Sequence, residues 1–234
     1  MDVHNVFKAN FCPVKKMVWL DAIHTFYSID LAFGLVSTFV AFFIAGYALR
    51  SYLLTRDRTS LFFSSTFFLI AFGLLSRVLF DYLVKFELTY NPRFVALHGM
   101  TSLQALMLTL SIFLITSGYT FLIALFFKIS SKRVMALLII LIALLTVTTS
   151  DAYLTAHVIP AVLLFFVLLH TAENFFKKRN RNTFLVFSSF MILFASELLF
   201  LLILKSISFY FVGSTLRVLA YLLLMVNMLL VLKR

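Results

Sequence analysis

This chain has few of the residues that soluble proteins use for their surfaces, turns and cross-links. Of its 234 residues, 12% are charged, six are glycine, three are proline and one, Cys12, is cysteine. A soluble domain is about one quarter charged, so the scarcity of charge excludes a soluble enzyme and a disordered tail. A lone cysteine excludes a disulfide framework and a cysteine-based metal cluster. In contrast, 63% of the residues are hydrophobic and the mean hydropathy is +1.07, as is typical of an integral membrane protein.

Seven apolar stretches follow one another along the chain, and most are separated by charged or turn residues. A helix needs about 20 mostly apolar residues to cross roughly 30 Å of hydrocarbon. The stretches cover residues 29–50, 59–83, 96–127, 134–150, 152–176, 183–204 and 208–232. We therefore predict an all-α bundle of seven transmembrane helices, with six or eight as the alternatives. Residues 1–28 are expected to form an extracytoplasmic or interfacial segment, and 29–234 a single transmembrane domain. Beyond shared hydropathy, no internal repeat is visible.

Positive charge collects on one side of such a bundle. If seven spans alternate in direction, one set of connections carries 12 of the 20 basic residues and two acids, for a net charge of +10. The rest of the chain has a net charge of +1. Because short basic loops mark the cytoplasmic side, we expect the N-terminus outside and the C-terminus inside a cell membrane. The excess charge thus indicates orientation, and the expected partner is the lipid bilayer rather than nucleic acid.

Two opposite charges lie at matching depth in the last two spans. Glu197 is 16 residues from Arg181, and Arg217 is 16 residues from Lys233, so each lies about 24 Å from the basic edge. Consecutive spans are usually neighbours, which predicts an ion pair between Glu197 and Arg217. The pair is interpreted either as a structural clasp or as part of a binding site.

Other polar residues fall at a similar depth, where ionisable groups are costly and therefore often functional. Asp30 and Asp151 also lie near this level but at the edge of the hydrocarbon. The distribution predicts an outward-facing polar pocket. Its candidate residues are Glu197, Arg217, Arg77, Asp81, His157 and Tyr221.

Metal and cofactor chemistry finds little support in the sequence. His157, His98 and Asp81 are weak metal-ligand candidates, since no HExxH or paired-histidine helix motif is present. His157 and His170 are 13 residues apart, a spacing that places them on different helix faces. The last span has no lysine for a retinal Schiff base. We expect no cofactor and assign no catalytic residue.

The first two spans, with YALRSYLLTRDR between them, have a layout that resembles seven-span sensor modules preceding microbial signalling domains. The resemblance covers about a quarter of the chain and implies a receptor-like or accessory role. Since no soluble output domain is visible, such a protein is expected to act through a membrane or cytoplasmic partner. The alternatives are a small-solute transporter or channel, and a metal-dependent membrane-embedded hydrolase.

Overall fold

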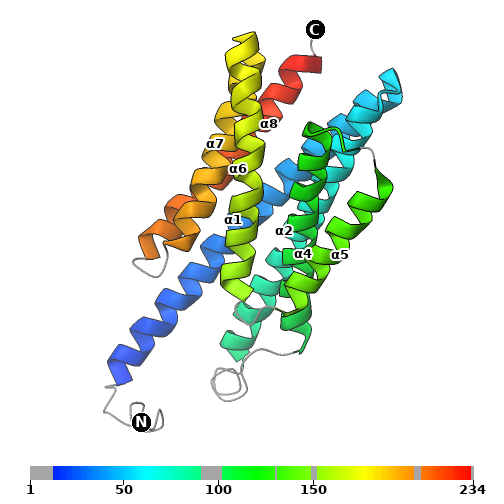
Figure 1. Cartoon of the computed structure of the whole chain (residues 1–234). Helices are drawn as coiled ribbons and strands as arrows, with labels where there is room; N and C mark the ends of the chain where they lie inside the picture. Colours follow the sequence, from blue (N-terminus) through cyan, green and yellow to red (C-terminus); the bar gives the residue numbers. More distant parts are fainter. Residues whose placement is uncertain (1–12, 91–101, 130, 149–151, 203–206, 233–234) are drawn as a thin grey trace.

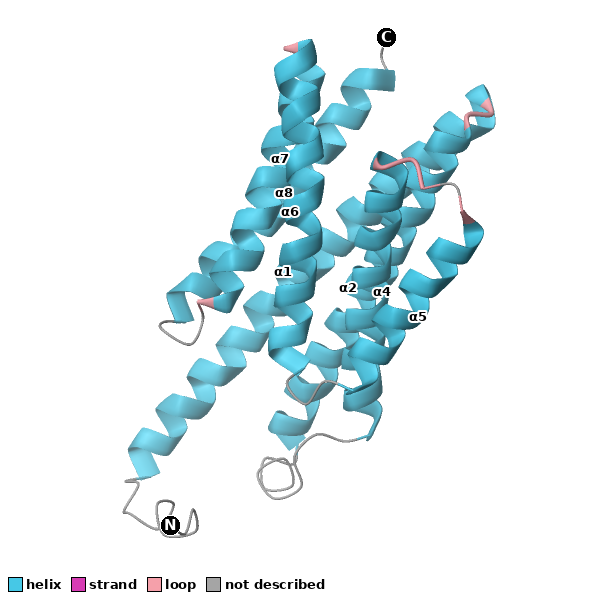
Figure 2. Ribbon diagram, viewed as in Figure 1, coloured by secondary structure: helices cyan, strands magenta, loops and turns pink. Residues whose placement is uncertain are grey.

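The computed structural model describes residues 13–90, 102–129, 131–148, 152–202 and 207–232. All regular secondary structure in these ranges is α-helical (Figure 2). The helices are α1 (Pro13–Thr55), α2 (Arg58–Tyr90), α4 (Ser102–Phe126), α5 (Lys132–Thr148), α6 (Ala152–Lys178), α7 (Arg181–Leu201) and α8 (Ile207–Leu232). Within the described residues, the predicted all-α fold with seven helices is confirmed, and seven membrane crossings stay a prediction.

Six of the seven helices are long and apolar enough to cross a membrane. The exception is α5, whose 17 residues extend about 25 Å, less than the roughly 30 Å of hydrocarbon. Helix α1 begins at Pro13 and continues without a break through residue 28, so the segment before the first predicted span is helical from there. The location of residues 1–28 at the membrane surface stays a prediction.

The six long helices form a closed ring, and α5 packs on its outside. Around the ring, α1 packs on α2, α2 on α4, α4 on α6, α6 on α7, α7 on α8, and α8 again on α1. In Figure 1, α6, α7 and α8 stand together on the left, α2, α4 and α5 on the right, and α1 slants behind them. Helix α5 packs on α4.

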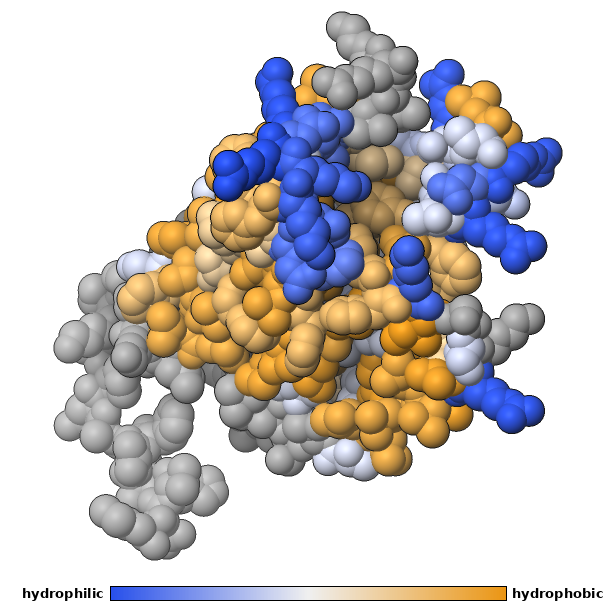
Figure 3. Space-filling model, turned by 45° about the horizontal axis from the view of Figure 1, so that its top comes forward, coloured by the Kyte–Doolittle hydropathy of each residue, from blue (hydrophilic) through white to orange (hydrophobic). Residues whose placement is uncertain are grey.

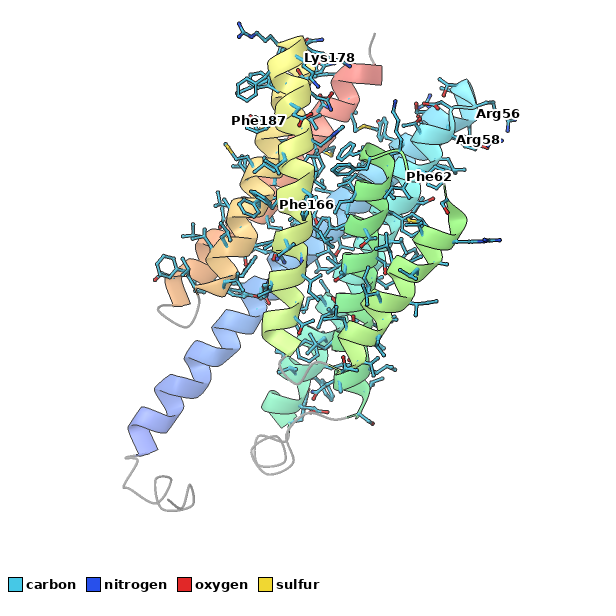
Figure 4. All side chains as sticks on the ribbon, in the orientation of Figure 1. Arg56, Arg58, Phe62, Phe166, Lys178 and Phe187 are labelled. Atoms are coloured by element: carbon cyan, nitrogen blue, oxygen red, sulfur yellow. The ribbon has the colours of Figure 1, made fainter. Side chains whose placement is uncertain are left out.

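One end of the bundle carries the basic residues and is called here the basic end. It holds the turns after α1, α4 and α6, which include Arg56, Lys128 and Arg179. Figure 4 places the labelled side chains of Arg56, Arg58 and Lys178 at this end. In Figure 3 hydrophilic residues gather along the same end above an apolar flank. The opposite end, where α2 and α7 end, is called the far end.

An apolar layer fills the middle of the ring. Its residues include Ile44, Ile70, Leu122, Leu164 and Leu193, all at most 1% exposed. Thr66 and Ser189 also lie at this level, and their hydroxyls donate to carbonyls of their own helices. Such back-bonding satisfies the hydroxyl hydrogen without a partner across the bundle. The layer therefore separates the two ends of the bundle with apolar contacts.

Candidate functional site

A cavity of about 60 Å³ lies inside the ring, between the apolar layer and the far end. All six long helices contribute to its wall. One water needs on the order of 10–15 Å³ of such space, so the cavity has room for a few waters or a small solute. Every predicted pocket residue lines it: Glu197, Arg217, Arg77, Asp81, His157 and Tyr221. The structure thus brings the candidates together, and their role in binding stays a prediction.

Glu197 is the centre of the larger polar cluster. Its side chain is 3% exposed, and its two carboxylate oxygens have different partners. Oε1 accepts a hydrogen bond from the Arg217 guanidinium at 2.9 Å, which confirms the predicted ion pair. Oε2 lies 2.8 Å from Nδ1 of His157. Because a carboxylate paired with arginine can only accept, Nδ1 carries the hydrogen of this bond. Glu197 therefore joins α6, α7 and α8 through two charge-assisted contacts.

Phe200 supports the two partners of Glu197. It lies one turn after Glu197 on the same helix face. The His157 ring stacks on Phe200 with centroids 4.8 Å apart, and the Arg217 guanidinium lies 4.3 Å from the same ring centroid. Tyr210 packs edge-on against Phe200 at 5.2 Å. An aromatic face under a guanidinium contributes a cation–π attraction that strengthens when water is excluded. These contacts fix the direction in which Arg217 and His157 face the cavity.

A second cluster faces the first from α1 and α2. Arg77 Nε lies 3.8 Å from Asp81 Oδ2, one helical turn away. Asp30 interacts electrostatically with both residues. Tyr210 on α8 interacts with Arg77 and Asp30, so it connects this cluster to the one around Glu197. The cavity wall therefore carries two guanidinium and three carboxylate groups, which can bind either sign of charge.

Two tyrosines close the cavity toward the apolar layer. The hydroxyl oxygens of Tyr119 and Tyr221 lie 3.4 Å apart, and both residues are at most 2% exposed. Hydroxyl pairs usually approach to about 2.7–2.8 Å, so this contact is long. The tyrosines present polar groups to the cavity and ring carbons to the apolar layer.

Tyr119 and Tyr210 line the cavity but are not among the residues predicted from the sequence. Tyr210 precedes Arg217 by seven residues, a spacing that places both on one face of α8. Reading that face as a polar stripe through Tyr210, Ser214, Arg217 and Tyr221 could have found it. Tyr119 has no comparable signal, because its polar partner comes from another helix.

The weak metal-ligand candidates do not form a site within the described residues. Across those ranges, no group of three His, Cys, Asp or Glu side chains could hold a metal ion. His157 and Asp81 line the same cavity but belong to different clusters. His98 and Asp151 lie outside the described residues.

Comparisons of the chain with known protein families, with curated proteins and with solved structures find no match. Function is therefore argued from the site alone.

Proposed function

We propose that the chain is a receptor-like or accessory protein of the cell membrane that binds a small charged solute in the far-end cavity. The buried carboxylate of Glu197, shared between His157 and Arg217, is the observation that carries this proposal. Ionisable groups inside a membrane are expensive to keep and usually mark a binding or transfer site. A solute carboxylate can compete with Glu197 for Arg217, and a solute ammonium can bind the carboxylates of Asp30 and Asp81.

The orientation that fits this function has the N-terminus outside and the C-terminus in the cytoplasm. Basic turns gather at one end of the bundle, and such turns favour the cytoplasmic side. The far-end cavity then faces outward, and the basic turns are the surface available to a partner. Single cysteines at 54–58, 129–132 and 178–181 should react only with reagent added to the cytoplasmic side, and those at 2–10 only from outside. Reaction of the 54–58 and 178–181 cysteines from opposite sides would contradict the arrangement.

Solute binding is tested by thermal unfolding of purified protein against a series of amino acids, short carboxylates and alkylamines. A ligand at 100 times its Kd stabilises the folded state by about 2.7 kcal/mol, which is a measurable rise in Tm. We expect a rise with one of these classes, and its loss in Glu197→Gln. Glu87→Gln is the matched control, because Glu87 accepts a hydrogen bond from Gln104 at 2.9 Å and lies outside the cavity wall.

The binding proposal fails if no compound in the series changes the Tm, or if the rise survives Glu197→Gln as fully as it survives Glu87→Gln. Co-purification of a second protein that is released when the basic turns are neutralised would support action through a partner.

A further inference from the structure

The ring is made of two three-helix groups with the same internal arrangement. In the group α1–α2–α4 and in the group α6–α7–α8, the first helix packs on the second and the second on the third. The first helix of each group also packs on the third helix of the other, α1 on α8 and α6 on α4. Both first helices run from the far end to the basic end (Figure 1). This is the pattern of a twofold axis parallel to the helices, with α5 joining the groups.

The turns between the first and second helices support this equivalence. Arg56-Asp57-Arg58 and Arg179-Asn180-Arg181 lie 123 positions apart. In each turn the leading arginine has a positive φ, 58° for Arg56 and 42° for Arg179. The residue that follows caps the next helix: Asp57 accepts from the Thr59 amide, and Asn180 forms a capping box with Thr183. The two turns therefore share both arginines and a capping residue between them, whereas the positive φ also occurs at Lys128 in the turn after α4.

The same offset of 123 pairs the innermost residues of both hairpins. Ala41 corresponds to Leu164, Ile44 to Val167, Thr66 to Ser189, Phe67 to Phe190 and Ile70 to Leu193. All ten are at most 1% exposed. The apolar layer is thus built from equivalent positions of the two groups.

The third helices correspond with an offset of 102, which pairs Tyr119 with Tyr221. Residues related by a twofold axis touch each other only at the axis, and these two hydroxyls are in contact. The close approach of the second and third helices is also repeated. A Cβ on Gly73 would lie 3.1 Å from the Ser111 carbonyl, and one on Gly213 would lie 3.4 Å from the Ser196 carbonyl. Gly73 corresponds to Ser196, and Ser111 corresponds to Gly213. Each of the two contacts, Gly73 with Ser111 and Ser196 with Gly213, therefore contains one glycine and one serine.

The far-end cavity lies on this axis, with its wall drawn from equivalent positions. Gly34 corresponds to His157, Leu74 to Glu197 and Arg77 to Phe200, and all six line the cavity.

Two adjoining pockets of about 310 and 330 Å³ lie at the basic end, on the other side of the apolar layer, and share Asn227. Their walls are also paired between the groups. Ser51 corresponds to Asn174, Ser60 to Thr183 and Leu125 to Asn227. The axis therefore passes through a hollow at each end and an apolar layer between them.

We propose that the two groups tilt against each other about the apolar layer, so that the solute bound in the far-end cavity is transported across the membrane. Parallel repeats with a binding site at their interface are a recurring frame for alternating access. Each ion pair of the cavity lies within a single group. Glu197 pairs with His157 and Arg217 in the second group, and Arg77 pairs with Asp81 in the first. Separation of the groups at the far end would therefore leave both ion-pair clusters intact and would break the contacts of Tyr210 with Arg77 and Asp30. Transport extends the solute binding proposed above, because a receptor requires only the far-end cavity.

The test follows the accessibility of each hollow in sealed vesicles of known orientation, in a Cys12→Ser background. Ser214→Cys reports on the far-end cavity and Ser51→Cys on the basic-end pocket. The probe is a membrane-impermeant cationic thiol reagent added to one side. We expect each cysteine to react from its own side only. In the double variant Ser214→Cys/Ser51→Cys, a bulky maleimide is first attached at position 214 from the far-end side. It should then slow the reaction of the cysteine at position 51 several-fold, because it holds the far end open and the basic end closed.

Thr215→Cys is the matched control, since Thr215 neighbours Ser214 but is exposed on the outer face of α8. Maleimide treatment of Thr215→Cys should leave the rate at Ser51→Cys unchanged. Asn174→Cys, the counterpart of Ser51 in the second group, should be slowed as Ser51→Cys is, which provides a second readout if one variant misfolds.

An unchanged rate at both Ser51→Cys and Asn174→Cys overturns transport and leaves solute binding intact. Coupled rates without any solute-dependent rise in Tm support the movement and overturn the proposed binding site. Slowing at Ser51→Cys but not at Asn174→Cys would contradict a tilt of the two groups about a common axis.

Discussion

The two three-helix groups share a frame but differ in the residues that face the far-end cavity. At the level of the apolar layer, paired positions carry similar residues, such as Phe67 and Phe190 or Ile44 and Val167. One or two turns toward the far end the pairs diverge, and Leu74 corresponds to Glu197. The two groups are therefore alike at the paired positions of the apolar layer and differ at a few paired positions that line the far-end cavity.

The groups also differ in what ties their helices together. In the first group, glycines bring α2 and α4 into close contact: a Cβ on Gly118 would lie 3.1 Å from the Thr66 carbonyl and 2.6 Å from an Ile70 carbon. In the second group, the carboxylate of Glu197 joins three helices. In a bilayer, both close packing of small residues and polar contacts stabilise helix association. Both groups contain a close glycine contact and a charged cluster, but within the described residues only in the second group does one carboxylate contact side chains on both of the other helices.

The largest effect is expected from breaking the charge network of the second group. Glu197→Gln and Arg217→Met should each lower the free energy of unfolding in detergent by about 3–5 kcal/mol, because the first leaves the Arg217 guanidinium without its carboxylate and the second leaves the Glu197 carboxylate with His157 alone. The double variant should lose less than the sum of the two single losses. Chemical unfolding of all four proteins measures this coupling. Strictly additive losses would contradict it, and a double variant that retains full solute binding would make the pair a structural clasp.

This ion pair could be predicted from the sequence, because the charge of a residue follows from its type and its depth follows from its position along the helix. Equal offsets from Arg181 and Lys233 placed Glu197 and Arg217 level with each other, and the structure confirms their contact. The seven helices were predictable for the same reason, since basic turns divide the apolar stretches. The predicted stretch 183–204, for example, agrees with α7 at Arg181–Leu201.

The depth of a residue along its helix does not predict the order of the helices around the ring. The contact of α1 with α8, and with it the meeting of Tyr119 and Tyr221, depends on ring closure. The correspondence between the two three-helix groups was also not predicted from the sequence, because few of their paired positions carry identical residues. The groups are alike in which positions face inward and in where their turns fall. Thr66 and Ser189 are chemically alike but Gly34 and His157 are not, so hydropathy alone does not align them.

An intermediate effect is expected from crowding the close contact of the first group. Gly118→Ala should lower the free energy of unfolding by about 1–3 kcal/mol, because its Cβ overlaps Ile70 and crowds the Thr66 carbonyl. Gly46→Ala is the matched control, since nothing lies within 4 Å of a Cβ at that position. Alanine is the better helix former, so Gly46→Ala should be neutral or slightly stabilising. Equal changes in both variants would contradict this prediction, because the close contact at Gly118 would then not determine the result.

The smallest effect is expected from single hydroxyls that bond between helices. Ser64 donates to the Ala45 carbonyl at 2.8 Å in the first group, and Ser196 donates to the Gly213 carbonyl at 2.9 Å in the second. Ser64→Ala and Ser196→Ala should each cost roughly 0.6 kcal/mol, the typical value for such contacts in membrane bundles. Ser65→Ala is the control, because that hydroxyl donates to the Leu61 carbonyl of its own helix. Since the two interhelical bonds lie in different groups, their losses should add in Ser64→Ala/Ser196→Ala. A loss at Ser65 as large as at Ser64 would mean that the hydroxyl acts on its own helix rather than between helices.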